Sequence, residues 1–226
     1  MKKIMMVAMA LIVASSVCFA DNSDYKNQVK ELKEKREISK KELNEKATKD
    51  ARKQAKKLEK EGWKVAPGAL PLEKQLNEAY LMQMEKDANY YPKFIMAEAK
   101  SIGQSYDAAK KSAISLAQSN LASTLQTEIA GMIDNTVANK QMEAGEAASI
   151  VEVVEASKNL FSQSLGRMIP VTECYREIKK TGNVEVLVRL AYNSELAKQA
   201  AKKIIEAELA KKGQDLHDQL NKALGF

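Results

Sequence analysis

Residues that commonly carry chemistry are few in this chain of 226 residues. It contains one histidine, His217, and two cysteines, Cys18 and Cys174. A zinc site of the usual kind needs three or four nitrogen or sulfur ligands, and a catalytic triad needs a histidine that the fold holds in place. His217 lies between Asp215 and Asp218 in a polar stretch, which indicates an exposed side chain. We therefore expect no metal site and no triad.

Phosphate-binding loops and acid–base pairs are not indicated by the sequence either. The nine glycines are scattered singly, and none falls in the G-x-G-x-x-G or G-x-x-x-x-G-K spacing that cradles phosphates. Two pairs of acids, Glu152/Glu155 and Glu206/Glu208, lie in stretches with a helical pattern, where we expect them to face solvent. These observations predict a protein without a cofactor and without enzyme activity.

Three aromatic residues and one thiol are the remaining candidates for a site. Trp63 is the only tryptophan, and Tyr90 and Tyr91 directly precede Pro92. One interpretation is that Trp63 anchors its segment to the domain, with the tyrosines packed at the domain edge. The other is that Trp63, Tyr90 and Tyr91 line a cleft for a small ligand or a glycan. For Cys174 we expect a buried apolar side chain, the alternative being a reactive or intermolecular thiol.

The elements that would position these residues are organised around residues 94–125. Residues 93–101 alternate between apolar and more polar types in a pattern that predicts a strand. A stripe at spacings of four then predicts a helix to about residue 126, with small side chains toward a core: Ala113, Ala117, Leu121 and Leu125.

The same two periodicities predict the other elements. We expect helices over 72–87, over 145–166 and from 194 onward, a second strand over 128–139, and a hairpin of 169–180 with 184–192. The predicted fold class is α+β, with a small antiparallel-rich sheet covered by helices and preceded by a long charged N-terminal helix. Residues 93–226 would form the domain, and the glycines and prolines within 62–92 indicate a linker with a short helix.

Residues 1–20 carry the pattern of a secretory signal peptide. A basic start precedes an apolar run, and small residues up to Ala20 predict cleavage after that residue. The run is too short to span a bilayer, which takes about 20 apolar residues, so no transmembrane segment is expected in the mature chain. Acylation of Cys18 is the alternative and would allow outer-membrane association, although Ser15 and Val17 depart from the lipoprotein pattern.

A charged segment, residues 21–61, would follow the signal peptide as a helical arm. It carries 14 lysines and arginines against 10 acids and contains neither glycine nor proline. A thin apolar line runs along one side of this helix: Leu43, Ala47, Ala51, Ala55 and Leu58. The arm is either solvated or forms a coiled coil with a partner protein or a second copy of this chain. No nucleic-acid binding is expected, because acids are interleaved with the bases.

Several short motifs lie between about residues 91 and 200. They are Gly103-Gln104-Ser105-Tyr106, Asp107-Ala108-Ala109, Asn120-Leu121-Ala122, Leu165-Gly166, Cys174-Tyr175-Arg176 and Val186-Leu187-Val188-Arg189-Leu190. In these motifs the segment resembles the LPP-twenty family of bacterial envelope proteins. The resemblance implies a small α+β envelope module, surface-exposed or periplasmic and without known catalysis, and it assigns no catalytic residue.

Together these patterns predict an exported, non-catalytic protein of the bacterial periplasm or cell envelope. It would act by association with a protein partner, with self-association through the helical arm as one route. The alternative is a periplasmic protein that binds a small ligand or a glycan, and an enzyme of unknown type comes third.

Overall fold

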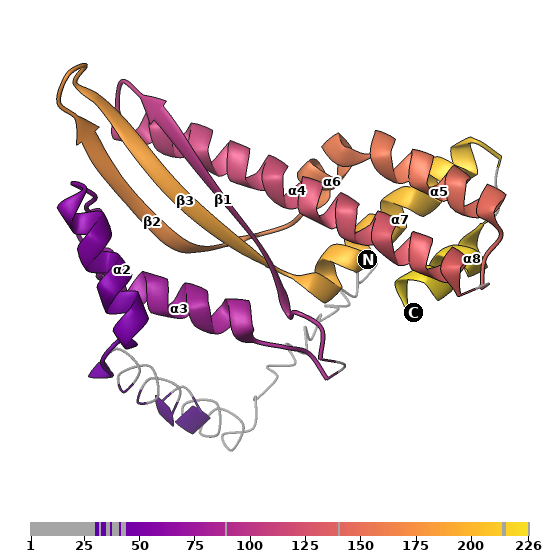
Figure 1. Cartoon of the computed structure of the whole chain (residues 1–226), viewed down its shortest axis with the longest axis horizontal. Helices are drawn as coiled ribbons and strands as arrows, with labels where there is room; N and C mark the ends of the chain where they lie inside the picture. Colours follow the sequence, from indigo (N-terminus) through magenta and orange to yellow (C-terminus); the bar gives the residue numbers. More distant parts are fainter. Residues whose placement is uncertain are drawn as a thin grey trace, which may run out of the picture. The chain divides into compact units, whose positions relative to one another are not determined.

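The fold is built on a three-stranded antiparallel sheet, shown in the computed structural model of the chain (Figure 1). The structure describes residues 30–31, 33–34, 37, 41, 44–88, 90–139, 141–213 and 216–225. The chain divides into two units, Met1–Lys46 and Ala47–Phe226. In the first unit the described positions between residues 30 and 44 are helical, and Leu43 lies outside the described residues.

The strands are β1 (Phe94–Gly103), β2 (Ile169–Ile178) and β3 (Asn183–Asn193), in the spatial order β1-β3-β2. Both neighbouring pairs are antiparallel, so β3 is the central strand, and β1 and β2 form the two edges. Gly182 joins β2 to β3 with a φ of 72°, a left-handed conformation that suits glycine in a hairpin turn. The predicted first strand and the predicted hairpin are confirmed, and so is the α+β class.

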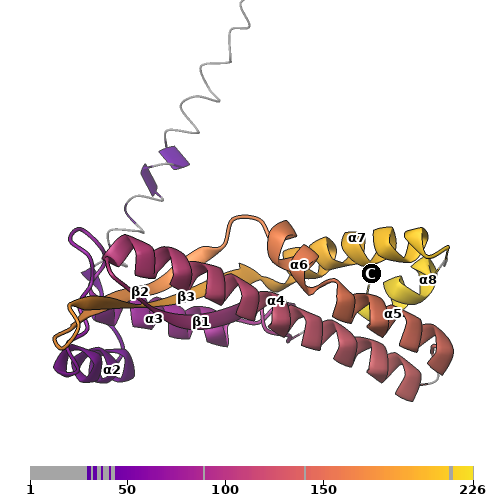
Figure 2. The same cartoon turned by 90° about the horizontal axis from the view of Figure 1, so that it is seen from above.

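Helices cover both faces of the sheet (Figures 1 and 2). Helix α4 (Tyr106–Ala138) lies on one face, and helices α2 (Lys49–Lys60) and α3 (Leu72–Met84) lie on the other. The central strand shows the division, because Val186 and Val188 belong to the cluster under α4, whereas Leu187 and Ala191 pack toward α2 and α3. Alternate side chains of β3 are thus buried on opposite faces, as the geometry of a strand requires.

Helix α4 continues beyond the sheet into a helical bundle. Its second half packs with four further helices: α5 (Ala144–Ala156), α6 (Lys158–Ser164), α7 (Ser194–Lys211) and α8 (His217–Leu224). The predicted second strand over 128–139 is wrong, because Ile129 and Ile133 are fully buried one helical turn apart while Gly131 faces solvent. None of the helices in the described ranges is long and apolar enough to cross a bilayer.

The predicted long charged helix over residues 21–61 is not continuous. Residues 45–48 are not helical, and α2 begins after Thr48. The Thr48 hydroxyl accepts a hydrogen bond from the Ala51 N–H over 3.3 Å, and the Thr48 N–H donates to Asn77 Oδ1 over 2.9 Å. This cap starts a new helix and ties its first turn to α3.

The compact unit also begins earlier than predicted, at Ala47 rather than at residue 93. Ala47, Ala51 and Ala55 are buried against α3 and the linker, because their small side chains let α2 lie close to its neighbours. Residues 62–92 are therefore part of the folded unit and form its second helical layer with α2.

Candidate binding site at the open edge of the sheet

The edge of β2 is closed by the segment that joins α2 to α3 and by α3 itself. The Lys64 N–H donates to the Tyr175 carbonyl over 2.7 Å, and the Tyr175 N–H donates to the Lys64 carbonyl over 2.8 Å. The Gln75 side chain accepts a hydrogen bond from the Glu173 N–H over 2.7 Å. The Tyr175 N–H and carbonyl and the Glu173 N–H therefore have partners within the chain.

The edge of β1 is open by comparison. Backbone groups of alternate residues in an antiparallel strand point to the same side. The Lys93 carbonyl accepts the Ser194 N–H over 2.9 Å, and this register directs odd-numbered residues of β1 toward β3. Even-numbered residues of β1 therefore point outward. The Lys93 N–H itself, just before β1, donates to the Glu85 carbonyl over 2.9 Å. Within the described part of the chain, the Glu98 carbonyl is the one outward group of β1 with a partner, the Asn120 side-chain amide at 3.1 Å.

A groove of about 490 Å³ runs along the first half of this open edge. Its floor is β1 from Phe94 to Glu98, and its walls include Gln83 of α3 and Thr124 and Glu128 of α4. The free backbone groups of β1 thus lie in a concave surface between two helical layers, a form in which proteins commonly bind ligands.

A loop between α3 and β1 presents two tyrosines beside the groove. The Asp87 N–H donates to the Tyr91 carbonyl over 2.8 Å, and Asp87 Oδ1 accepts from the Tyr91 N–H over 2.9 Å. Tyr90 has a φ of 64°, and its side chain is 81% exposed. A left-handed backbone at a residue other than glycine costs about 1–2 kcal/mol, so the closed loop holds Tyr90 in solvent against local strain.

A second cleft, of about 330 Å³, opens between this loop, α4 and the start of α7. Tyr91 and Lys198 line it, and the Lys198 ammonium lies 5.6 Å from the centroid of the Tyr91 ring. Pro92 and Glu128 line both this cleft and the groove along β1, so the two adjoin. We call the combined surface, from Tyr91 and Lys198 through Glu128 to β1 residues 94–98, the edge groove.

The end of the edge groove near Tyr91 is acidic. Asp87, Glu128 and Glu195 line it, and Lys198 is the one cation in its described lining. Partial burial raises the pKa of Glu128, and the Lys198 ammonium acts in the opposite direction. A partly desolvated carboxylate is stabilised by a positive charge nearby, so this end of the groove favours a cationic group on a ligand.

Trp63 lies elsewhere, so the predicted cleft of three aromatic residues is wrong. Its side chain is 2% exposed and packs with Leu72, Leu76 and Cys174 on the face of the sheet that α2 and α3 cover. The Arg176 guanidinium carbon lies 4.7 Å from the centroid of the indole ring, within the range of a cation–π contact. The other interpretation, that Trp63 anchors the linker to the domain, is confirmed.

The apolar line predicted to meet a partner helix is covered by the chain itself. Ala47, Ala51 and Ala55 are buried and Leu58 is half-buried, all in one cluster with Trp63. The described part of the line therefore leaves little apolar surface for a partner. The prediction was wrong because Trp63, which follows α2 in the chain, packs in the same cluster as these alanines, and the spacing of the alanines alone does not show that contact.

The two residues considered for reactive chemistry have structural contacts. Cys174 is buried as expected, and desolvation raises the pKa of its thiol to about 12, which disfavours the nucleophilic thiolate. His217 is exposed as expected, and its Nδ1 lies 2.6 Å from Glu206 Oε1. Within the described residues, no group of three His, Cys, Asp or Glu side chains is placed to hold a metal ion.

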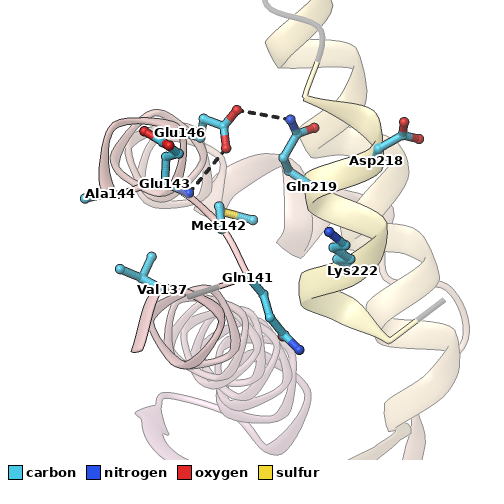
Figure 3. A pocket seen from close by; sticks show the side chains of 9 residues that line it. All are labelled: Val137, Gln141, Met142, Glu143, Ala144, Glu146, Asp218, Gln219 and Lys222. Atoms are coloured by element: carbon cyan, nitrogen blue, oxygen red, sulfur yellow. Dashed lines mark hydrogen bonds between the residues drawn. The ribbon is translucent and has the colours of Figure 1, made fainter. Parts of the chain in front are cut away.

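A further opening, of about 500 Å³, lies at the end of the helical bundle (Figure 3). Glu146 of α5 faces Gln219 of α8 there, and its Oε1 accepts a hydrogen bond from Gln219 Nε2 over 3.1 Å. Its Oε2 accepts from the Glu143 N–H over 3.4 Å, which caps the first turn of α5. The Glu146 carboxylate therefore joins two helices, and the described lining includes no aromatic side chain.

Sequence reasoning found the two tyrosines but missed the rest of the edge groove. The pair before Pro92 was the available signal, whereas Glu128 and Lys198 belong to different helices and meet only in the tertiary structure. No protein-family model, curated protein or solved structure matches the chain, so the candidate site rests on its own geometry, and the resemblance to the LPP-twenty family stays a prediction.

Proposed function

We propose that this chain is an exported, non-catalytic protein of the bacterial cell envelope that acts by binding another protein in the edge groove. The observation that carries the proposal is an open strand edge next to two exposed tyrosines on a closed loop. Natural proteins usually close or blunt such edges, and tyrosine is enriched where proteins meet. The β2 edge of the same sheet is closed, which makes the open β1 edge a specific feature of this fold.

Apolar side chains close to the loop favour a protein over a small ligand. Leu81 and Met84, near the end of α3, are more than half exposed, and so is Leu196 in the first turn of α7. Exposed apolar side chains near a groove are typical of surfaces that bind proteins. The partner surface proposed here therefore replaces the apolar line of α2, which the chain itself covers.

Export is proposed on the pattern of residues 1–20, and the resemblance to the LPP-twenty family supports the same compartment. Mass spectrometry of the protein purified from the envelope fraction should give a chain that begins at Asp21. A chain that begins at an acylated Cys18 would instead place the protein on a membrane, and an uncleaved chain would contradict export.

A photo-reactive amino acid at Tyr91 tests the binding proposal in cells. We expect a covalent adduct with another protein on illumination, because the Tyr91 side chain lines the groove and is 59% exposed. The matched control carries the same amino acid at Gln163, an exposed position of α6 outside the groove. The proposal fails if neither position gives a protein adduct, or if both positions give the same ones.

Glycan binding is the second candidate function, and the cleft beside Tyr91 is the observation that favours it. An exposed aromatic ring there is combined with the amide of Asn135 and the carboxylate of Glu128, groups that suit sugar hydroxyls. Soluble N-acetylglucosamine oligomers titrated into ¹⁵N-labelled protein provide the test. Saturable shifts at the Tyr91 and Asn135 amides, without a protein adduct at Tyr91, would favour this candidate.

A further inference from the structure

We infer that the partner binds as an extended peptide, which adds a fourth strand to the sheet along β1 and places a lysine or arginine side chain beside Glu128. The inference rests on the proposed function and specifies the chemistry of its partner.

The free backbone groups of β1 have the spacing of a strand. Phe94 and Met96 direct their N–H and C=O groups outward, and no described residue bonds to them. Alternate residues of a strand lie about 6.8 Å apart, and another extended backbone offers donors and acceptors at the same repeat. The groove leaves space for such a segment, because these residues form its floor.

The opposite edge shows that this sheet accepts an extended segment. Lys64 forms an isolated antiparallel bridge with Tyr175 through two backbone hydrogen bonds of 2.7 and 2.8 Å. The linker thus gives the outward groups of β2 the backbone hydrogen bonds that the partner peptide would give those of β1.

Asn120 sets where the added strand ends. Its side-chain amide already donates to the Glu98 carbonyl over 3.1 Å, so the free part of the edge within the groove lies around Phe94 and Met96. An added strand there makes few backbone hydrogen bonds, and each contributes little net free energy. Side-chain contacts must therefore supply much of the affinity, as buried anchors do at other interfaces.

Glu128 supplies the contact that selects the peptide side chain. It lines both parts of the edge groove, next to β1 and next to Tyr91. Neighbouring carboxylates are engaged, since Glu98 Oε2 lies 2.7 Å from Arg189 Nη2 and Glu195 accepts a hydrogen bond within its own helix. Glu128 has neither a hydrogen bond nor an ion pair among the described residues; burial raises its pKa, and Lys198, whose ammonium already lies over the Tyr91 ring, acts to lower that pKa without forming an ion pair with it. A peptide cation on the β1 side would give Glu128 a direct ion pair.

A short random peptide library displayed on phage, panned against the full-length chain, supplies the probe. The selected peptides are synthesised and titrated into the protein by fluorescence polarisation. We expect sequences that favour an extended strand and carry Lys or Arg at a fixed position. A selected family without a basic residue would overturn the charge assignment.

Met96→Pro and Met96→Ala separate the backbone contribution from that of the side chain. Both variants shorten the side chain, but proline also removes an outward N–H that has no partner among the described residues, a change that edge strands tolerate. We expect Met96→Pro to bind the selected peptides roughly tenfold more weakly than Met96→Ala. Equal affinities in two folded variants would overturn strand addition and leave the proposed function standing.

Peptides with N-methyl groups on alternate amides repeat the test on unaltered protein, in case Met96→Pro does not fold. One of the two methylation registers should abolish binding and the other should preserve it, because alternate amides of a strand point to opposite sides. Tolerance of both registers would overturn strand addition.

Glu128→Gln tests the basic residue. We expect roughly threefold to tenfold weaker binding of a lysine-containing peptide and no change for the same peptide with norleucine in its place. No loss with lysine, or equal losses with both, would overturn the role of Glu128. If panning yields nothing while Tyr91 still photo-crosslinks to a protein, the inference falls and the proposed function stands. If neither experiment detects binding, both fall.

Discussion

The two edges of one small sheet differ in how the chain treats their backbone groups. At β2, the Lys64 backbone and the Gln75 side chain bond to outward groups, and Trp63 packs beside them in a buried cluster. At β1, the Asn120 side chain donates to the Glu98 carbonyl, whereas the outward backbone groups of Met96 have no partner in the described part of the chain. The neighbouring loop exposes its two tyrosines. The chain itself thus satisfies outward backbone groups at the β2 edge and leaves those around Met96 accessible, where we propose that the partner binds.

The largest difference is expected between the aromatic residues at the two edges. Trp63→Ala removes a fully buried indole and should lower the free energy of unfolding by about 3–5 kcal/mol. Tyr91→Ala, at a largely exposed position, should lower it by no more than about 0.5 kcal/mol. Urea denaturation of both variants and wild type gives the comparison, and similar losses would show that the buried indole contributes no more to stability than the exposed tyrosine.

A second comparison concerns the side chains that bond to each edge. Gln75 accepts from the Glu173 N–H and donates to the Leu70 carbonyl over 2.8 Å, and it is buried. Gln75→Ala should therefore lower the free energy of unfolding by about 1–3 kcal/mol, because the Glu173 N–H loses its acceptor. Asn120→Ala should cost about 0.5 kcal/mol or less, since water replaces its amide at the exposed Glu98 carbonyl.

Hydrogen exchange locates these two effects. The Glu173 amide should exchange faster in Gln75→Ala, while its rate in Asn120→Ala should match that of wild type. Equal costs for the two variants, or an unchanged Glu173 rate in Gln75→Ala, would contradict the view that the β2 edge is closed by this side chain.

Local periodicity was sufficient to predict the three strands and the first part of the helix that covers one face, but not the order of the strands or the full length of α4. Ile95 and Ala97 alternate along β1, and both are buried in the core under α4. Ala113 and Ala117 lie four residues apart on α4, and both are buried in the same core. Periodicity failed over residues 128–139, where β-branched residues imitate a strand although Gly131 disfavours one. Packing against the bundle decides that segment, and a single sequence does not show this tertiary contact.

The candidate site was predicted only where it is local in sequence. Tyr90 and Tyr91 adjoin a proline, a short-range feature that can be read from the chain. Trp63 was wrongly grouped with them, since proximity along the chain does not determine which face of a sheet a residue covers. Glu128 and Lys198 meet because α4 and α7 are packed in one unit, a result of side-chain packing that no local pattern encodes.

The pH dependence of stability provides a third test, at the closed side of the sheet. Burial raises the pKa of the Cys174 thiol from its ordinary value of 9.0 to about 12. Between these values the unfolded chain releases a proton that the native protein keeps, so stability should fall as pH rises through this window. From pH 8 to pH 10, wild type should lose about 1 kcal/mol more than Cys174→Ala. Equal losses would mean that water reaches the thiol.

The smallest effect is expected at the tip of the tyrosine loop. Tyr90 has a left-handed backbone, with a φ of 64°, whereas Tyr91 is not among the residues of positive φ in the described chain. Tyr90→Gly relieves that strain, which offsets the flexibility that glycine adds to the unfolded chain, so stability should stay equal or rise by up to about 1 kcal/mol. Tyr91→Gly has no strain to relieve and should lose about 0.5–1 kcal/mol of stability.

Thermal unfolding measures both changes in stability, and crosslinking from Gln83, another residue of the edge groove, measures partner binding in the same variants. If the strain places the Tyr90 side chain where the partner contacts it, Tyr90→Gly should reduce crosslinking while leaving the protein at least as stable. If Tyr90→Gly destabilises the protein as much as Tyr91→Gly and leaves crosslinking unchanged, the left-handed tyrosine serves the loop and not the partner.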